Sequence, residues 1–320
     1  MYLCNRNYNM EENMLRRALL ACALMLVTLL MGAQPSFTVG QYNIRYDARK
    51  DVKKGNGWEQ RRPHIISFIN YQQWDVVGLQ EVLNSQLDDL MAGLDGYAAI
   101  GVGRDNGKQR GEYTPILYRK NRMRCLESGT FWLSEKPDKA GSVGWDAAVP
   151  RICTWAQFED MHTGWRFWMF NVHMDHVGTM ARREGAKLVM AKVEEMCGGE
   201  PYLLTGDLNV DQHDEIYAML TAPGMFVDAI DKASRRYVNN GTTNAFSVNR
   251  YSENRIDHIF VSERFDVHKY GILPLVYWAL TDCSDNPYEA RMLSDHYPVE
   301  AVVELPHLRI GAVIGPAGCQ

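Results

Sequence analysis

The sequence has no internal repeat, no low-complexity tract and no linker rich enough in proline, glycine or serine to divide it into parts. It also has no cluster of lysine and arginine, which is the usual mark of a surface that binds nucleic acid. What remains is an ordinary globular composition, since 46% of the 320 residues are hydrophobic and 23% are charged. A chain of this length can bury a large core. We therefore expect a globular protein without an obvious nucleic-acid footprint.

Cysteine is scarce and irregularly spaced. None of the seven cysteines forms a CxxC pair or another metal-binding spacing, so the sequence gives no sign of a metal site built on thiolates. Five cysteines follow residue 33, and an odd number in a chain too long to need covalent staples argues against a disulfide framework. We expect buried thiols, with one left free.

Long apolar runs are absent except for one near the start. Residues 18–33 (ALLACALMLVTLLMGA) carry no charge and follow Arg16 and Arg17. The basic flank and the short apolar stretch predict a secretory signal peptide over residues 1–33, and hence a periplasmic or secreted protein. The run falls short of the roughly 20 residues of a spanning helix, so we expect no stable membrane anchor after cleavage. A retained anchor is the alternative.

The rest of the chain, residues 34–320, is expected to form a single domain. It holds 31 basic and 37 acidic residues, a net charge of −6. This balance disfavours an extended nucleic-acid partner but permits a phosphate ligand at one local site.

Short runs rich in β-branched and aromatic residues recur along the chain and predict strands. Helical periodicity lies between some of them, most clearly over 179–197, which Gly198 and Gly199 should terminate. This pattern predicts an α+β fold, a two-sheet β-sandwich flanked by helices in four layers. The expected strands are 37–46, 75–82, 98–103, 114–120, 153–160, 166–174, 201–209, 255–262 and 297–305, and the expected helices are 58–72, 84–94, 179–197 and 214–222.

Several expected strands carry, at or near their ends, a polar side chain that can bind a metal or a phosphate. A rigid scaffold often presents a functional site in this way. These side chains belong to Asn43, Glu81, His173, Asp207, Asn209 and Asp257.

Each of these residues also has a structural explanation. Asn43 could be a structural hydrogen-bonding group, and Glu81, after the apolar run VVGLQ, a solvated strand end. Alternatively, Mg²⁺ would relieve the cost of a carboxylate in a dry site, because it binds one or two carboxylates together with water and phosphate oxygens. Asp207 and Asn209 are two residues apart, so in an extended chain they share a face and can position a water and a phosphate oxygen.

The stretch LSDHYPVEAVVEL, residues 293–305, places Asp295 beside His296. Neighbours in an extended chain point to opposite faces, so we do not expect these two to pair. Asp257 lies in an apolar frame and needs a partner if it is buried. His296 is the candidate, because a histidine held by a carboxylate is a recurring arrangement. Asp295 would then face a metal or a backbone amide.

The motifs YNIR, LQEV, PILYR, NVHMDH, GDLN, RIDHIFVS and SDHYPV occur in this order along the chain. Together they resemble the endonuclease/exonuclease/phosphatase superfamily, and the resemblance covers residues 37 to 305. The segment 175–190 further resembles exported bacterial hydrolases of this superfamily. The resemblance implies a DNase I-like sandwich, a divalent-metal site and hydrolysis of phosphoester bonds.

The resemblance also assigns roles residue by residue. At the metal site it places Asn43, Glu81 and Asp295, with Glu81 the main ligand. It implies that Asp207 orients or deprotonates the attacking water and that Asp257 holds His296. It implies that the scissile phosphate is held by His173, Asn209 and His296.

Arg45 and His173 depart from the abasic-site nucleases of the superfamily, many of which carry an aspartate where Arg45 stands. An arginine cannot ligate a cation, which weakens a two-metal mechanism. Substrate contacts are expected from Arg151, Tyr113 and Arg182, although the pattern around Arg182 favours a surface charge on an amphipathic helix.

We therefore predict a Mg²⁺-dependent phosphoesterase, with Mn²⁺ as a possible substitute, that hydrolyses a phosphodiester or a phosphomonoester by in-line attack of water. The net charge favours a small or lipid-like phosphoester as its partner. The alternatives are a secreted nuclease and a non-catalytic module that binds a phosphorylated ligand. The sequence does not predict an oligomeric state.

Overall fold

The computed structural model describes residues 14, 16–17, 36–281 and 285–306. The chain divides into two units, Met1–Pro35 and Ser36–Gln320, and the fold described below belongs to the second. The signal peptide expected over residues 1–33 lies outside the described residues, apart from Met14, Arg16 and Arg17. Among the described residues, no helix is long and apolar enough to cross a membrane.

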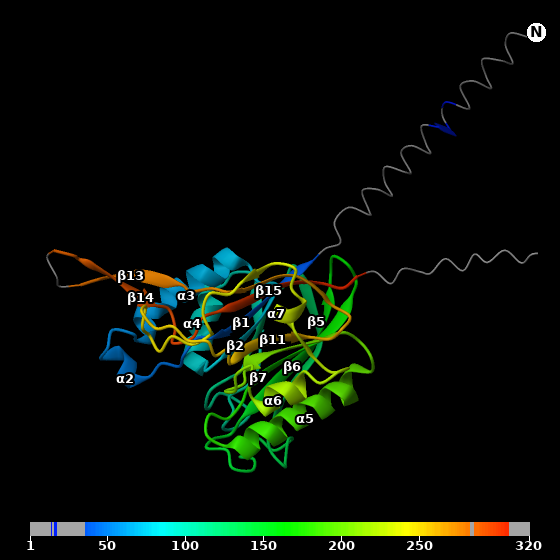
Figure 1. Ribbon diagram of the computed structural model, residues 1–320, viewed down its shortest axis with the longest axis horizontal. Coiled ribbons are helices and arrows are strands. Elements are labelled where there is room, and N and C mark those ends of the chain that lie inside the picture. Colours follow the sequence, from blue (N-terminus) through cyan, green and yellow to red (C-terminus); the bar gives the residue numbers. More distant parts are fainter. Residues whose placement is uncertain (1–13, 15, 18–35, 282–284, 307–320) are drawn as a thin grey trace, which may run out of the picture. The chain divides into compact units, whose positions relative to one another are not determined.

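Two mixed β-sheets form the centre of the unit (Figure 1). A separate two-stranded ribbon, β13 (Val276–Leu280) with β14 (Tyr288–Met292), lies beside them. In spatial order, the first sheet contains β10 (Arg236–Tyr237), β12 (Asp266–Ile272), β15 (Val299–Glu304), β1 (Phe37–Asn43), β2 (Val76–Gln80), β4 (Ile116–Arg119) and β3 (Tyr97–Ile100). The second contains β5 (Met123–Trp132), β6 (Ile152–Asp160), β7 (Arg166–His173), β8 (Tyr202–Asp207), β11 (Asp257–Val261) and β9 (Val227–Asp228).

The two sheets pack face to face around a shared apolar core. Val39 and Val76 of the first sheet belong to the same buried cluster as Phe158 and Met169 of the second. A cluster of this kind forms because alternate residues of each strand point inward and lose contact with water. Close approach between the sheets also uses glycine, since a Cβ atom at Gly78 would overlap the side chains of Thr205 and Asn171.

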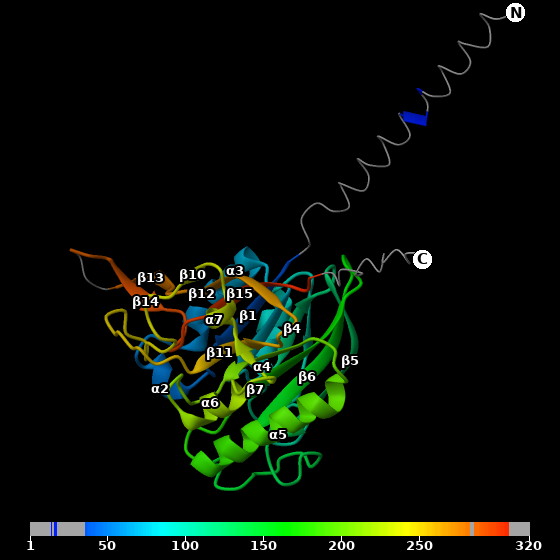
Figure 2. The ribbon, with the colours of Figure 1, turned by 45° about the vertical axis from the view of Figure 1, so that its right-hand side comes forward.

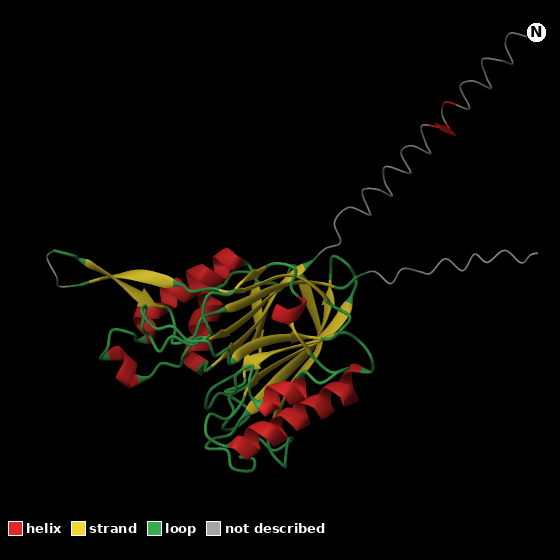
Figure 3. Ribbon diagram, in the orientation of Figure 1, coloured by secondary structure: helices red, strands yellow, loops and turns green. Residues whose placement is uncertain are grey.

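Helices cover the outer faces of both sheets (Figure 3). Ile65 and Ile69 of α3 pack in one cluster with the first sheet, and Val189 and Val193 of α5 pack in another with the second. The expected four-layer α+β sandwich is thus confirmed. The helices are α2 (Arg49–Val52), α3 (Trp58–Gln72), α4 (Asn84–Gly93), α5 (Thr179–Cys197), α6 (Glu215–Leu220) and α7 (Ala229–Lys232).

Helix α5 has the bounds that its periodicity predicted, and Gly198 ends it in the left-handed conformation at φ 54°. Strand β5 was not expected. Its sequence, MRCLESGTFW, lies at an edge of the second sheet and is half exposed, so it lacks the apolar run that marks a buried strand. The strand expected over 98–103 is shorter in the structure, where β3 runs from Tyr97 to Ile100.

Strand register brings the candidate residues to one edge of the sandwich. Figure 2 shows the ribbon of the sandwich from a second direction. His173 is opposite Asp207 on the parallel strands β7 and β8, and Asp257 is opposite Asp207 on the antiparallel strands β11 and β8. In the first sheet, Asn43 is opposite Gln80, so Glu81 follows directly beside it. These ends of the two sheets meet at the site described next.

Three of the five cysteines that follow residue 33 are described. Cys125, Cys153 and Cys197 are free thiols, and Cys153 and Cys197 are buried. Cys283 and Cys319 lie outside the described residues.

Candidate active site

A pocket of about 450 Å³ opens where the ends of the two sheets meet. Its lining residues are polar except Val149, and they come from strand ends of both sheets, from helix α2 and from the connecting loops. The lining residues are Arg45, Tyr46, Lys50, Glu81, Arg104, Glu112, Val149, Arg151, His173, His176, Asp207, Asn209, Asp295 and His296.

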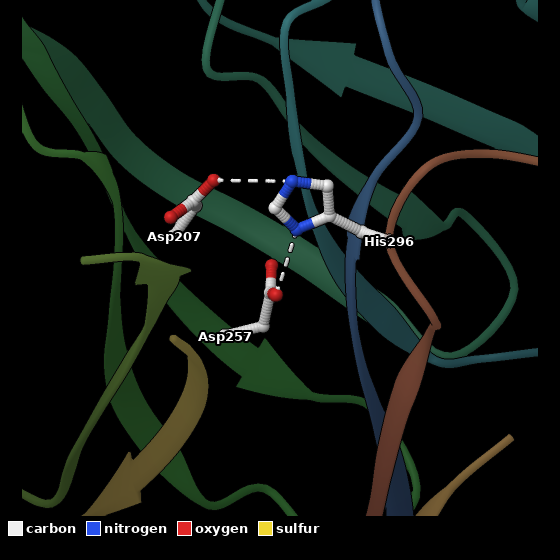
Figure 4. Close-up of side chains that lie close together, drawn as sticks. All are labelled: Asp207, Asp257 and His296. Carbon is white, nitrogen blue, oxygen red and sulfur yellow. Dashed lines mark hydrogen bonds and ion pairs between the residues drawn. The ribbon is translucent and has the colours of Figure 1, made fainter. Parts of the chain in front are cut away.

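His296 is held by Asp257 (Figure 4). Its Nδ1 lies 2.8 Å from Oδ2 of Asp257, and the other carboxylate oxygen accepts a hydrogen bond of 2.9 Å from Gln41 Nε2. Although burial opposes the charged form, the Asp257 carboxylate raises the pKa of His296 well above its ordinary value. His296 is therefore an imidazolium at neutral pH, with Nε2 directed toward Asp207.

Asp207 lies between the two histidines. Its Oδ2 is 3.6 Å from His173 Nε2 and 3.8 Å from His296 Nε2, which is near enough for attraction but too long for a hydrogen bond. Asn43 Nδ2 donates to the same oxygen at 2.9 Å. Burial, reinforced by the charge of Asp257, raises the pKa of Asp207 to about 7. A carboxyl group of this pKa can accept a proton near neutral pH.

His173 has the opposite charge state from His296. Burial lowers its pKa well below the ordinary value, and the guanidinium groups of Arg151 and Arg104 lower it further. His173 is therefore neutral, so the pocket holds one neutral imidazole and one imidazolium on either side of Asp207.

Asn209 and Glu81 have left-handed backbone conformations, with φ angles of 51° and 59°. Arg45 also lines the pocket and has a φ of 60°. Such conformations are strained for residues other than glycine and persist where surrounding contacts hold them, often at functional sites. Two hydrogen bonds hold Asn209. Its backbone N–H donates to Asp207 Oδ1 at 3.0 Å, and its Nδ2 donates to the carbonyl of Met174 at 3.0 Å.

Glu81 and Asp295 form a second acidic corner of the pocket. Arg45 connects them, with Nη1 3.5 Å from Glu81 Oε2 and 3.7 Å from Asp295 Oδ2. Burial, together with the charge of Glu81, raises the pKa of Asp295. Asn43 donates from Nδ2 to Glu81 Oε1 at 3.1 Å, and its own oxygen accepts from the backbone N–H of Arg45.

These donors fit a divalent cation. Two half-buried carboxylates, those of Glu81 and Asp295, share the single guanidinium of Arg45. Hard oxygen ligands of this kind are those that Mg²⁺ and Mn²⁺ prefer.

Asp207, Asp257 and His296 are also close enough together to hold a metal, with donor atoms within 4.8 Å of one another. The hydrogen bonds of these residues argue against metal binding by this cluster. Both oxygens of Asp257 are already engaged, and an imidazolium offers no lone pair to a metal. The oxygen donors of Glu81 and Asp295 therefore fit a divalent cation better than this cluster does.

Arg151 lines the pocket from the start of β6 and is 4% exposed. Its Nε donates to Asp175 Oδ2 at 3.2 Å, and Nη2 lies 2.8 Å from Nδ1 of His176. Its Nη1 is buried without a hydrogen-bond partner. Although burial acts to raise it, backbone N–H groups of the following turn hold the pKa of Asp175 at about 2, so this carboxylate stays charged against Arg151.

Tyr113 and Arg182 are not brought to the pocket. Tyr113 is 4% exposed within the core beneath the first sheet, and its hydroxyl donates to Asn84 Oδ1 at 2.8 Å. Arg182 donates to the carbonyl of Asp175 at 2.9 Å. The other candidates line the pocket, except Asn43 and Asp257, which contact lining residues from behind.

The sequence reasoning missed Arg104, Lys50 and Gln41. Arg104 lines the pocket from an irregular loop and Lys50 from the short helix α2, and Gln41 supports Asp257 from inside β1. A signal was present for Gln41, because a glutamine inside an otherwise apolar strand must satisfy its amide in the core. For Arg104 the only signal was the polar loop that precedes Glu112.

The family model described as Endonuclease/Exonuclease/phosphatase family matches residues 40–296. The chain belongs to this family. Members are hydrolases that act on phosphoester bonds and generally depend on a divalent metal, and this chain is accordingly a phosphoester hydrolase.

Several similar solved structures come from species of Bacteroides. A family protein from Bacteroides thetaiotaomicron is 44% identical with a TM-score of 0.83, covering 86% of this chain and 100% of that one. A mannosyl-6-phosphatase from the same species is 45% identical with a TM-score of 0.81, covering 84% and 99%. A family protein from Bacteroides vulgatus is 39% identical with a TM-score of 0.76, covering 85% and 100%.

Proposed function

We propose that this protein is a Mg²⁺-dependent phosphomonoesterase that removes phosphate from a sugar phosphate. The observation that carries the proposal is the pocket itself, in which the Asp207 and histidine cluster, the acidic metal corner and four cationic side chains share one small cavity. Similarity to a mannosyl-6-phosphatase supports a sugar as the alcohol part of the substrate. We further propose that the protein acts after export.

The cationic lining favours a terminal phosphate. A phosphomonoester carries up to two negative charges where a diester carries one, and guanidinium groups bind such oxygens through paired hydrogen bonds. Arg151, with a buried Nη1 that lacks a partner, is suited to this role. The lining also holds Lys50, and Arg45 and Arg104, which are already paired with carboxylates.

In the proposed mechanism, Asp207 orients the attacking water and accepts its proton while the new P–O bond forms and the P–O bond to the sugar breaks. The leaving sugar oxygen takes up a proton from solvent. His296, as an imidazolium, donates from Nε2 to a phosphoryl oxygen, and neutral His173 donates to another. Asn209 has one side-chain N–H left after its bond to Met174 and directs it to the same phosphate. A bound divalent cation would supply Lewis-acid polarisation of a phosphoryl oxygen.

Asp257 acts through His296. By accepting a hydrogen bond from Nδ1–H, Asp257 fixes the orientation of the ring and keeps it charged. Hydrogen bonds aimed at the charge that develops on phosphorus are the largest contribution that such a site makes to the rate.

A substrate panel tests the proposal. The purified protein with Mg²⁺ is offered mannose 6-phosphate, p-nitrophenyl phosphate, bis(p-nitrophenyl) phosphate, an inositol phosphate, sphingomyelin, DNA and RNA. We expect the highest kcat/KM for the sugar monoester and little turnover of diesters or nucleic acid. A higher kcat/KM for a diester or a nucleic acid would contradict the proposal.

A further inference from the structure

Arg104 and Glu112 form a buried ion pair that the phosphate chemistry leaves unused. Nη1 and Nη2 of Arg104 donate to the two oxygens of Glu112, each at 2.8 Å. Both side chains are largely buried, with 13% and 17% exposed, yet both line the pocket. The Nε of Arg104 is buried without a hydrogen-bond partner.

The pair stands close to where the phosphate must bind. The positive charge of Arg104 contributes to lowering the pKa of His173, as does that of Arg151. Glu112 in turn feels the charges of Glu81 and Arg45. A group attached to a phosphate held by His173 and Arg151 therefore has the pair within the same cavity.

The loop that carries the pair is fixed in shape. The backbone N–H of Arg104 donates to the carbonyl of Glu112 at 3.1 Å, and Trp132 Nε1 donates to the carbonyl of Arg104 at 2.7 Å. Gly111 adopts a φ of 82°, and a Cβ atom there would lie 2.5 Å from the carboxyl group of Asp105. Such support holds the two side chains in one geometry before substrate arrives.

A neutral pair of charges suits an uncharged polar ligand better than an anion. The carboxylate of Glu112 would repel phosphoryl oxygens, which offsets the attraction of Arg104. The remaining lone pairs of Glu112 can accept from a hydroxyl group, and the free N–H groups of Arg104 can donate to one. Two neighbouring hydroxyls on a sugar ring match this arrangement of donor and acceptor.

We propose that Arg104 and Glu112 bind ring hydroxyl groups of the alcohol part of the substrate and so select a sugar phosphate over other phosphomonoesters. The proposal rests on the phosphomonoesterase function proposed above and deepens it. In this arrangement the phosphate is held by His173, Asn209, Arg151 and His296, and the sugar ring is held by the ion pair.

Binding measured in a variant with strongly reduced turnover tests this assignment. In a His296→Ala background, calorimetric titration with Mg²⁺ compares mannose 6-phosphate with inorganic phosphate, with and without Glu112→Gln. We expect Glu112→Gln to weaken mannose 6-phosphate binding about 10- to 100-fold, as for the loss of a hydrogen bond to a charged group, and to leave phosphate binding within about twofold. Arg104→Lys, which keeps the charge but loses the fork, should act in the same direction.

Turnover supplies the second measurement. Glu112→Gln should raise KM for mannose 6-phosphate while leaving kcat/KM for p-nitrophenyl phosphate, which has no hydroxyl groups, nearly unchanged. The matched control is Glu159→Gln, which weakens the ion pair to Arg124 outside the pocket. It should change KM and kcat/KM for neither substrate.

Equal losses for the sugar and the hydroxyl-free ligands would overturn the proposal, as would no loss for either. A selective effect on binding together with an absence of phosphomonoester turnover would retain the subsite and reject the proposed function. Turnover of p-nitrophenyl phosphate without a selective effect of Glu112→Gln would retain the proposed function and reject the subsite.

Discussion

At the scale of single residues, the site depends on two histidines that have different protonation states. His296 and His173 lie on either side of the same oxygen of Asp207, at 3.8 and 3.6 Å. The carboxylate of Asp257 keeps the first protonated, whereas burial and two guanidinium groups keep the second neutral. One fixed cation and one neutral donor therefore flank the group that must accept a proton.

Replacing His296 by alanine should lower kcat by about 10²–10³, because one preorganised donor to the developing phosphoryl charge is lost. Phosphate release from the best substrate measures the effect. His162→Ala is the control, since His162 is exposed and lies outside the pocket. Full activity in His296→Ala would rule out the proposed mechanism.

The acid side of the pH profile should report Asp207. Burial and Asp257 raise its pKa to about 7, so below that pH the carboxyl group is protonated and cannot accept the proton of water. We expect kcat/KM to fall as the pH drops below neutrality, with a bound cation moving the midpoint down to between about 5 and 7. A profile that stays flat to pH 4, near the ordinary aspartate value, would show that Asp207 does not act as the base.

At the scale of elements, strand register assembles the site from sequence-distant segments. Asp207 faces His173 across one strand pair and Asp257 across another. A shift by one residue would turn each of these side chains to the opposite face of the sheet. The close contact between the sheets at Gly78 supports this register from behind the pocket, where Gln80 Nε2 donates to Asn171 Oδ1 at 2.8 Å.

Adding one methyl group in each of two elements should have opposite effects. At Gly78 the added Cβ would overlap Thr205 and Asn171, so Gly78→Ala should lower the free energy of unfolding by about 1–3 kcal/mol. At Gly185 in α5 the nearest atom would be Leu133 Cδ1 at 3.5 Å, an ordinary contact. Gly185→Ala should therefore raise the free energy of unfolding by about 0.5–1 kcal/mol through helix propensity.

Urea unfolding followed by circular dichroism measures both changes. If Gly78→Ala were as stable as the unmodified protein, the sheets would not be in the close contact described above.

At the scale of the whole molecule, the charged residues of the site lie together at one edge of the sandwich, and apolar side chains fill the core between the sheets. Glu81 follows β2 and His296 precedes β15 of the first sheet, whereas Asp207 and Asp257 lie in the second, so the site exists only when both sheets are packed. The net charge of −5 says little about this local balance of acids and guanidinium groups.

Removing divalent metal should abolish activity, and Mg²⁺ or Mn²⁺ should restore it. Glu81→Gln should raise the Mg²⁺ concentration needed for half-maximal activity about tenfold or more, because a charged oxygen ligand is lost. Glu159→Gln serves again as the control. Activity that survives exhaustive chelation would exclude a required dissociable cation.

Export gives a further expectation. Expressed at full length in a bacterial host with a secretion pathway, the protein should be recovered outside the cytoplasm with its first residue near position 34. The mass of the recovered chain measures this. An intact chain retained in the cytoplasm would contradict the signal-peptide prediction.

Much of the arrangement could be predicted from sequence because it follows from local pattern. Period-two runs and the 179–197 helix defined the layers, and α5 has the predicted bounds. The pairing of His296 with Asp257 was expected because a buried aspartate needs a partner. Strand β5 could not be expected, since an exposed edge strand leaves little hydrophobic signal.

The sequence by itself determined which residues are chemically able to act, because carboxylates, imidazoles and amides at strand ends can bind a metal or a phosphate. Tertiary structure alone decided where they point. Arg104 entered the pocket and Tyr113 was packed into the core, although both lie in one polar segment. The physical reason is that burial, charge balance and register depend on what two distant sheets bring together, and no local pattern records that.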